Sequence, residues 1–152
     1  LTTIFPEARL KKFIEMRGAD AGQWHRLCAL PAFWVGICYD QGSLDAAWDI
    51  VKNWDENDRE NLRIAAAEDG LKGSVGSISL IDLAKEAVRV SESGLKKRAQ
   101  ASSNGLYSDE SLFLDSLKEN IEKRKSSADE LLEKYHGSWN KDLTKVYEEY
   151  SY

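Results

Sequence analysis

The sequence has no long apolar run, and this absence excludes the simplest kind of membrane protein. A helix needs about 20 predominantly apolar residues to span a bilayer, and no segment of the 152-residue chain approaches that length. The first residues also lack the charged and then apolar pattern of a secretory signal. We therefore expect no membrane partner and a cytoplasmic location.

Cysteine, histidine and excess positive charge are also scarce. Cys28 and Cys38 form no CxxC pair, and His25 and His136 stand far apart, so the spacing of a zinc site is missing. Reduced, packed thiols are the simplest interpretation of the two cysteines. The formal net charge of -5 opposes the concentrated positive field that nucleic-acid binding requires. We expect no nucleic-acid partner.

What the chain does contain is the composition of one ordinary folded domain. Charged residues make up 31% and apolar residues 42% of the sequence, and the length is near that of a usual compact domain. We therefore treat residues 1–152 as a single domain. The chain begins with Leu1 rather than methionine, which suggests a fragment or a processed product.

The first 20 residues favour β structure. The segment "LTTIF" at residues 1–5 is strand-like, and "ARLKKFIEMR" at residues 8–17 alternates as in one half-buried strand. Successive side chains of a strand point to opposite faces, so Leu10, Ile14 and Met16 would share an apolar face. The opposite face would carry Arg9, Lys11, Phe13, Glu15 and Arg17.

From Trp24 onward the pattern is helical. The segment "WHRLCALPAFWVGICYD" is apolar nearly all round, as in a buried central helix, and Pro31 either kinks it or opens its second half. A second stripe at helical spacing consists of Leu44, Ala47, Trp48 and Val51. We expect this stripe to face the core.

The remaining helices are amphipathic. One contains Gly94, a residue that can end or weaken a helix, and Ser127 with Glu130 fits the capping box of a later one. Between them, residues 99–111 are the best candidate for a mobile loop. The predicted fold class is α+β and predominantly helical: one or two N-terminal antiparallel strands followed by a bundle of about six helices.

Two motifs resemble a known enzyme family. "EMRGAD" and "RLCALPAFWVG" at this spacing, with "ADELLEKYHGSWNKDLTKVYEEYSY" at the carboxyl end, resemble the C-terminal part of glutamate–cysteine ligase of the plant and proteobacterial type. The resemblance implies an ATP-dependent enzyme that joins glutamate to cysteine through γ-glutamyl phosphate, the first step of glutathione biosynthesis. It also implies a glutamine-synthetase-like sheet, with residues 1–20 as an active-site strand region and residues 23–152 as helical backing.

The same resemblance implies roles for two charged residues. Glu15 matches a strand glutamate that binds magnesium, and Arg17 matches an arginine directed at the transferring phosphoryl group. Such chemistry needs metal ions and fixed cations where charge develops, and Mg²⁺ prefers carboxylate oxygen. A shared face would let both side chains point into one cavity. The spacing alone favours a different reading, a Glu-x-Arg pair on a solvated strand face.

Four further residues have open roles. Arg9 and Lys11 either extend a positive wall for phosphate or substrate or are surface charges. Asp20 either binds a metal-bound water or caps the loop after the strand. Cys28 matches a position that, in the plant branch of the family, forms a regulatory disulfide with a cysteine far upstream, so it is a possible redox cysteine whose partner is absent from this chain.

These observations leave two hypotheses. In the first, the chain is part of a ligase that needs ATP, Mg²⁺, glutamate, cysteine and its missing N-terminal part, and the isolated chain is inactive. In the second, the chain is a stand-alone, non-catalytic helical assembly or regulatory module derived from the ligase. A strand without sheet neighbours exposes unpaired backbone groups, so self-association of the fragment is expected.

Overall fold

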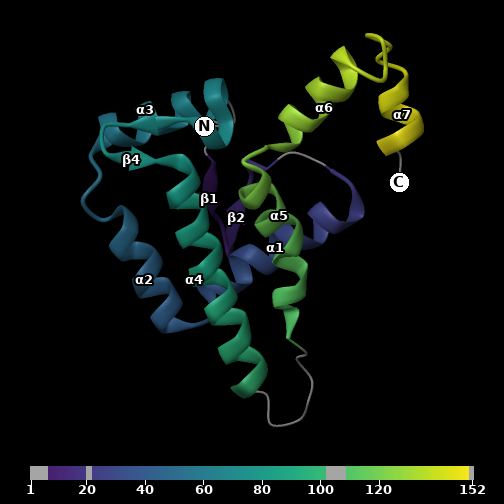
Figure 1. The fold of residues 1–152 in the computed structure, drawn as a ribbon. Helices are drawn as coiled ribbons and strands as arrows, with labels where there is room; N and C mark the ends of the chain where they lie inside the picture. The colour runs from purple at the N-terminus through teal and green to yellow at the C-terminus, as the bar shows by residue number, and fades with distance from the viewer. Residues whose placement is uncertain (1–6, 20–21, 102–108, 151–152) are drawn as a thin grey trace.

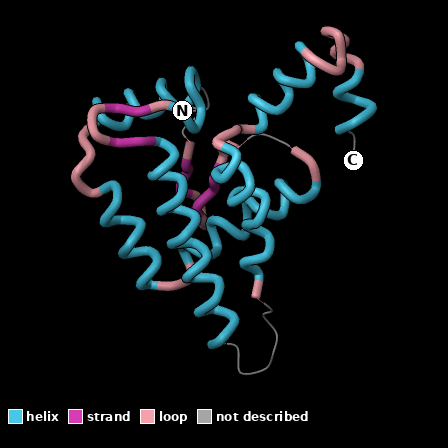
Figure 2. The backbone as a smooth tube through the Cα atoms, viewed as in Figure 1, coloured by secondary structure: helices cyan, strands magenta, loops and turns pink. Residues whose placement is uncertain are grey.

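The structure is a computed structural model that describes residues 7–19, 22–101 and 109–150. In chain order its elements are β1 (Ala8–Leu10), β2 (Ile14–Met16), α1 (Trp24–Cys38), α2 (Gln41–Val51), α3 (Glu56–Asp69), η1 (Gly70–Lys72), β3 (Ser74–Val75), β4 (Ile78–Ser79), α4 (Leu80–Ala101), η2 (Glu110–Leu114), α5 (Asp115–Lys123), α6 (Ser127–His136) and α7 (Lys145–Tyr150). Figure 1 shows their arrangement, and Figure 2 shows that helices dominate and that strands form two short pairs. The predicted fold class is confirmed.

The strand region is a hairpin, so the prediction of one strand over residues 8–17 is wrong. β1 and β2 pair antiparallel, with Ala8 opposite Met16 and Leu10 opposite Ile14. The chain bends between them at residues 11–13, which contain none of the glycine, proline, asparagine or aspartate residues that usually mark a turn. The alternation is interrupted at the bend, where Lys12 falls on the face predicted to be apolar and Phe13 on the charged face.

The apolar face predicted for this region is largely exposed. Leu10 is 81% exposed and Ile14 is 67% exposed, while Met16 is half-buried. A two-stranded hairpin has few neighbours to cover its faces, since isolated hairpins need further strands or a helix for burial. The hairpin thus presents apolar side chains to solvent.

The core forms where α1 and α4 cross at close range. Its buried members are Ala32, Val88, Leu95 and Leu114, and Phe33, Val35, Leu117 and Ile121 pack around them. The crossing depends on small residues: Ser91 is fully buried and donates a hydrogen bond of 2.8 Å to the carbonyl oxygen of Phe33. A Cβ at Gly94 would overlap the carbonyl oxygen of Gly36. α4 continues through Gly94 to Ala101, so Gly94 does not end the helix.

Two other expectations about the helices are corrected. α1 is not buried all round, because the apolar residues Trp24 and Leu30 are exposed, and the helix continues through Pro31. The α2 stripe lies on the surface, with Trp48 63% exposed and Leu44 and Val51 also exposed. Periodicity identifies an apolar face but does not say which element, if any, covers it.

The α6 and α7 helices form an arm set apart from the other helices (Figure 1). Its capping box is Ser126 with Asp129, one residue before the predicted pair. Inside the arm, Trp139 is buried and its indole nitrogen donates to Glu149 at 2.7 Å. Lys134 also contacts Glu149, at 2.8 Å. The arm therefore has a small core of its own.

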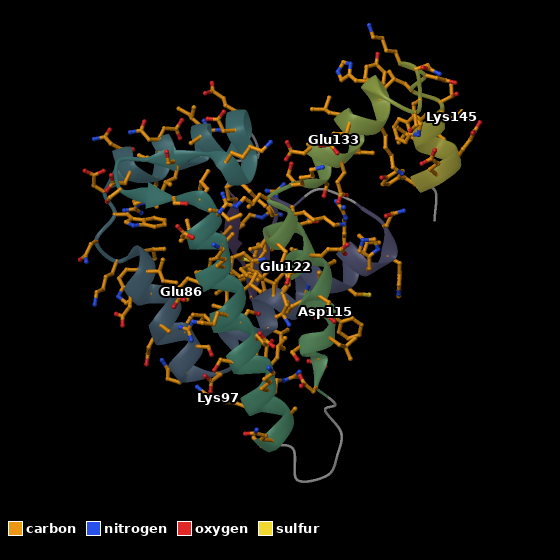
Figure 3. The ribbon with its side chains drawn as sticks, in the orientation of Figure 1. Glu86, Lys97, Asp115, Glu122, Glu133 and Lys145 are labelled. Atoms are coloured by element: carbon orange, nitrogen blue, oxygen red, sulfur yellow. The ribbon has the colours of Figure 1, made fainter. Side chains whose placement is uncertain are left out.

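The charged side chains labelled in Figure 3 are exposed or half-buried on the helices that carry them. Among the helices of the described ranges, none has the length and apolar character that a membrane crossing needs. The strand-like segment 1–5 and residues 102–108 of the predicted loop lie outside the described residues.

Candidate functional site

A cavity of about 730 Å³ lies between the hairpin, α1, α5 and the start of α6. Its wall is mainly apolar and includes Met16, Leu30, Phe33, Trp34, Leu117 and Leu131. Ligand sites in proteins typically occupy about 300–1,000 Å³ and combine apolar walls with a few polar groups. The cavity therefore has the size and lining of a binding site.

Arg17 lines this cavity from the end of the hairpin. Its backbone N–H donates to the carbonyl oxygen of Glu7 at 2.9 Å, which extends the β1–β2 pairing by one residue. The side chain is half-buried. The hairpin thus holds a guanidinium at an apolar cavity, where its electrostatic effect is stronger than in water.

Glu15 does not line the same cavity, and its closest charged partner is Arg9. The hairpin register places the two residues directly opposite each other. The Arg9 Nε and Nη2 atoms both lie 2.7 Å from Oε2 of Glu15. Of the predicted wall residues, Arg9 is therefore the ion-pair partner of Glu15, while Lys11 is exposed in the bend.

The cations of the hairpin keep Glu15 ionised. The hydrogen bond from Arg9 is the largest cause that lowers the pKa of the Glu15 carboxyl below its ordinary value, and the charges of Lys11 and Arg17 add to this effect. A lowered folded-state pKa stabilises the fold above the unfolded pKa, and this contribution is lost as the pH falls through the folded pKa. Glu15 is therefore an anion at neutral pH.

The described residues do not by themselves form a magnesium site. Across the described ranges there is no cluster of three or more His, Cys, Asp or Glu residues that could hold a metal ion. Mg²⁺ demands near-octahedral oxygen coordination, and Glu15 offers one carboxylate. Asp20, the other acid considered for a metal, lies outside the described residues.

The two cysteines are free thiols on α1. They lie ten positions apart in one helix, which separates them by about 15 Å along its axis and rules out a disulfide between them. Cys38 is exposed, so the expectation of a packed thiol is wrong for this residue, although partial burial raises the pKa of its thiol. Cys28 is half-buried, and a redox role would need a partner outside α1.

Arg26 is a cavity residue that the sequence analysis missed. It lies on α1 and lines the cavity together with Arg17. Its Nη2 atom donates to Oε2 of Glu130 on α6 at 2.8 Å, and both side chains are largely buried. The signal in the sequence is the spacing of Arg26, Leu30 and Phe33: positions i, i+4 and i+7 share one helix face, so Arg26 lies on the same face as two apolar residues of the cavity wall.

Comparison with known proteins places this chain in a family of ligases. Residues 1–149 match the model of glutamate-cysteine ligase family 2, and the chain belongs to this family. It is 42% identical to the chloroplastic glutamate–cysteine ligase of Solanum lycopersicum, 43% to that of Nicotiana tabacum and 41% to that of Arabidopsis thaliana. Each comparison covers 100% of this chain and 28% of the relative, so the chain spans about 28% of their length.

These relatives contradict the expected cytoplasmic location. Each is named as a chloroplastic enzyme, which points to a plastid. The expectation failed because it used only the absence of a secretory signal and of membrane spans, and neither absence carries information about a plastid address.

Proposed function

We propose that this chain is the C-terminal portion of an ATP-dependent glutamate–cysteine ligase that forms γ-glutamylcysteine through γ-glutamyl phosphate, the first step of glutathione biosynthesis. The supporting observation is 40–43% identity along all 152 residues to enzymes named glutamate–cysteine ligase. The substrates are glutamate, cysteine and ATP, with Mg²⁺ as the metal cofactor.

In this proposal the hairpin supplies charge to the reaction. Arg17 holds a guanidinium next to the transferring phosphoryl group, where a fixed cation stabilises developing negative charge. Glu15 supplies one carboxylate ligand to Mg²⁺, and the other ligands come from the missing N-terminal part. Arg9 holds the Glu15 carboxylate, and Lys11 contributes positive charge nearby. Cys28 is available for a redox partner elsewhere in the ligase.

The isolated chain is expected to be inactive, because one metal ligand and one arginine do not complete a phosphoryl-transfer site. The test compares the purified chain with a chimera in which it replaces the matching 28% of the Solanum lycopersicum ligase. Both are given ATP, Mg²⁺, glutamate and cysteine, and γ-glutamylcysteine is measured by chromatography. We expect product from the chimera alone.

The controls separate folding from function. The parent ligase and the parent lacking its matching segment set the upper and lower limits of activity. A folded chimera as inactive as the truncated parent would contradict the proposed function. Product from the isolated chain would contradict its dependence on the missing part.

The exposed hairpin favours self-association of the isolated chain. The alternative function, a non-catalytic assembly module, requires such self-association. Leu10, Phe13 and Ile14 are all more than half exposed, and an open strand edge can pair with another chain. We expect a concentration-dependent dimer in sedimentation velocity that Ile14→Lys weakens. Leu132→Lys, a control at an exposed site on α6, should leave the dimer intact. A monomer at high concentration would remove this alternative.

A further inference from the structure

The hairpin has one apolar face, and this face continues from the cavity onto the exposed surface. Ala8 pairs with Met16, and Leu10 pairs with Ile14. Because paired residues and residues two positions apart share a face, both pairs lie on the same side of the hairpin. Ala8 and Met16 line the cavity, whereas Leu10 and Ile14 are 81% and 67% exposed. The cavity wall and this exposed strip therefore form one apolar surface.

The charges around the cavity cancel. Arg17, Arg26 and Glu7 line it, and Glu130 accepts a hydrogen bond of 2.8 Å from Arg26. Two guanidinium groups are thus balanced by two carboxylates. The rest of the wall is mainly apolar, and removing apolar surface from water stabilises a complex by about 25 cal/mol per Å². The cavity therefore favours an apolar occupant over an ion.

The hairpin also offers backbone groups for pairing. β1 and β2 have three residues each, and in the described part of the chain they pair only with each other. Such a hairpin is marginally stable in water until further strands or a helix cover it. An extended segment added at its edge would satisfy backbone groups and place alternate side chains against the apolar face.

The remainder of the ligase is in the right place to supply this segment. Under the proposed function it precedes the chain, and since the chain spans 28% of its relatives, it is more than twice as long as the chain. The connection runs through the residues before Glu7, and Glu7 lines the cavity. A covalent link gives such a segment a high effective concentration at the apolar surface. A second copy of the chain has no such advantage.

We propose that an apolar, extended segment from the missing N-terminal part of the ligase docks on this surface, pairs with an edge of the hairpin and fills the cavity with its side chains. The inference rests on the proposed function, which supplies the occupant. Arg9 and Glu15 pair on the opposite face of the hairpin, so docking leaves the Glu15 carboxylate uncovered. It also shields the Arg17 side chain, which lines the cavity, from water.

Met16 is a built-in probe of this docking. It is the one methionine of the sequence, it is half-buried and it lines the cavity. Hydrogen peroxide oxidises an accessible methionine to its sulfoxide. Peptide mass spectrometry measures Met16 oxidation in the isolated chain, at a concentration where the chain is monomeric, and in the ligase chimera without substrates. We expect oxidation to be at least about tenfold slower in the chimera, with added free methionine as the standard of oxidant dose.

Two variants of the chimera test the surface itself. Leu30 lines the cavity and is exposed, so Leu30→Glu places a carboxylate at the wall and is expected to restore the oxidation rate of the isolated chain. Leu132→Glu is the matched control, because Leu132 is an exposed leucine on α6 outside the cavity lining; Met16 should stay protected in it. Circular dichroism establishes whether each protein folds.

Several results would overturn the proposal: equal oxidation of Met16 in the isolated chain and the folded chimera, or unchanged protection in a folded Leu30→Glu chimera. Protection that appears only after ATP, glutamate and cysteine are added would assign the cavity to a substrate. Protection that rises with chimera concentration would assign it to a second copy. If Leu30→Glu does not fold, the comparison of chain and chimera still decides.

Failure of this inference is distinguishable from failure of the proposed function. An active chimera with unprotected Met16 contradicts the docking alone. An inactive chimera with protected Met16 contradicts the ligase activity alone. If the chimera does not fold, a second one built on the Nicotiana tabacum ligase takes its place in the same measurement.

Discussion

Turnover is expected to fall at least about 100-fold when Arg17→Ala is introduced into the ligase chimera, since one fixed donor to a transition state is typically worth a few kcal/mol. Arg17 is half-buried and lines an apolar cavity, so water replaces the lost cation poorly. The loss should appear in kcat more than in KM, because the charge that Arg17 stabilises develops during phosphoryl transfer. Steady-state kinetics at saturating ATP measures it.

Two further variants make this result specific. Arg17→Lys keeps the charge but loses the planar pair of donors, so it should recover part of the turnover. Lys12→Ala removes an exposed cation from the bend of the same hairpin and should leave turnover nearly unchanged. Near-normal turnover in a folded Arg17→Ala chimera would remove Arg17 from the proposed mechanism.

The second large effect concerns stability: Gly94→Val is expected to lower the free energy of unfolding by about 3 kcal/mol or more. A Cβ at this position would overlap the backbone carbonyl of Gly36 and lie 2.9 Å from the Ser43 hydroxyl. Backbone cannot rotate out of the way, so α1 and α4 must separate. Their separation would also break the buried hydrogen bond from Ser91 to Phe33. Urea unfolding followed by circular dichroism measures the change.

Gly42→Ala is the matched control for this substitution. Gly42 also lies in a helix, and the atom nearest to an added Cβ is the mobile Lys97 ammonium at 3.2 Å. Alanine gains up to about 1 kcal/mol over glycine in a helix, so this variant should be neutral or slightly more stable. If Gly94→Val is equally stable, the close approach of α1 and α4 does not hold the core together.

Local sequence patterns predicted where helices occur better than they predicted which helix faces are buried. The helical spacing in α2 correctly indicates a helix, yet Trp48 is exposed. The predicted capping box of α6 lies one residue too late in the sequence. Ser126 and Ser127 are adjacent, and each is followed by an acidic residue three positions later. Side chains this similar are distinguished only by the backbone conformation of the N-cap residue.

The candidate site shows the same difference: local sequence indicates the residue types, and tertiary contacts decide their neighbours. Glu15 and Arg17 stand out in the sequence as charged residues in an apolar segment, and the resemblance attaches roles to them. Their actual neighbours depend on the hairpin, which pairs Glu15 with Arg9 and places Arg17 at a cavity. Arg26 and Glu130 are 104 positions apart, so no local pattern could have joined them.

The sequence by itself therefore determined the family, the predominance of helices and the chemical types of the candidate residues, because all three reside in short motifs and in periodicity. Tertiary structure alone decided that residues 8–17 bend into a hairpin, that Gly94 allows α1 and α4 to touch, and that Arg17 and Arg26 meet at one cavity. The physical reason is that turn formation, helix approach and cavity lining depend on contacts between distant segments, and the energy of such contacts is absent from any local window of sequence.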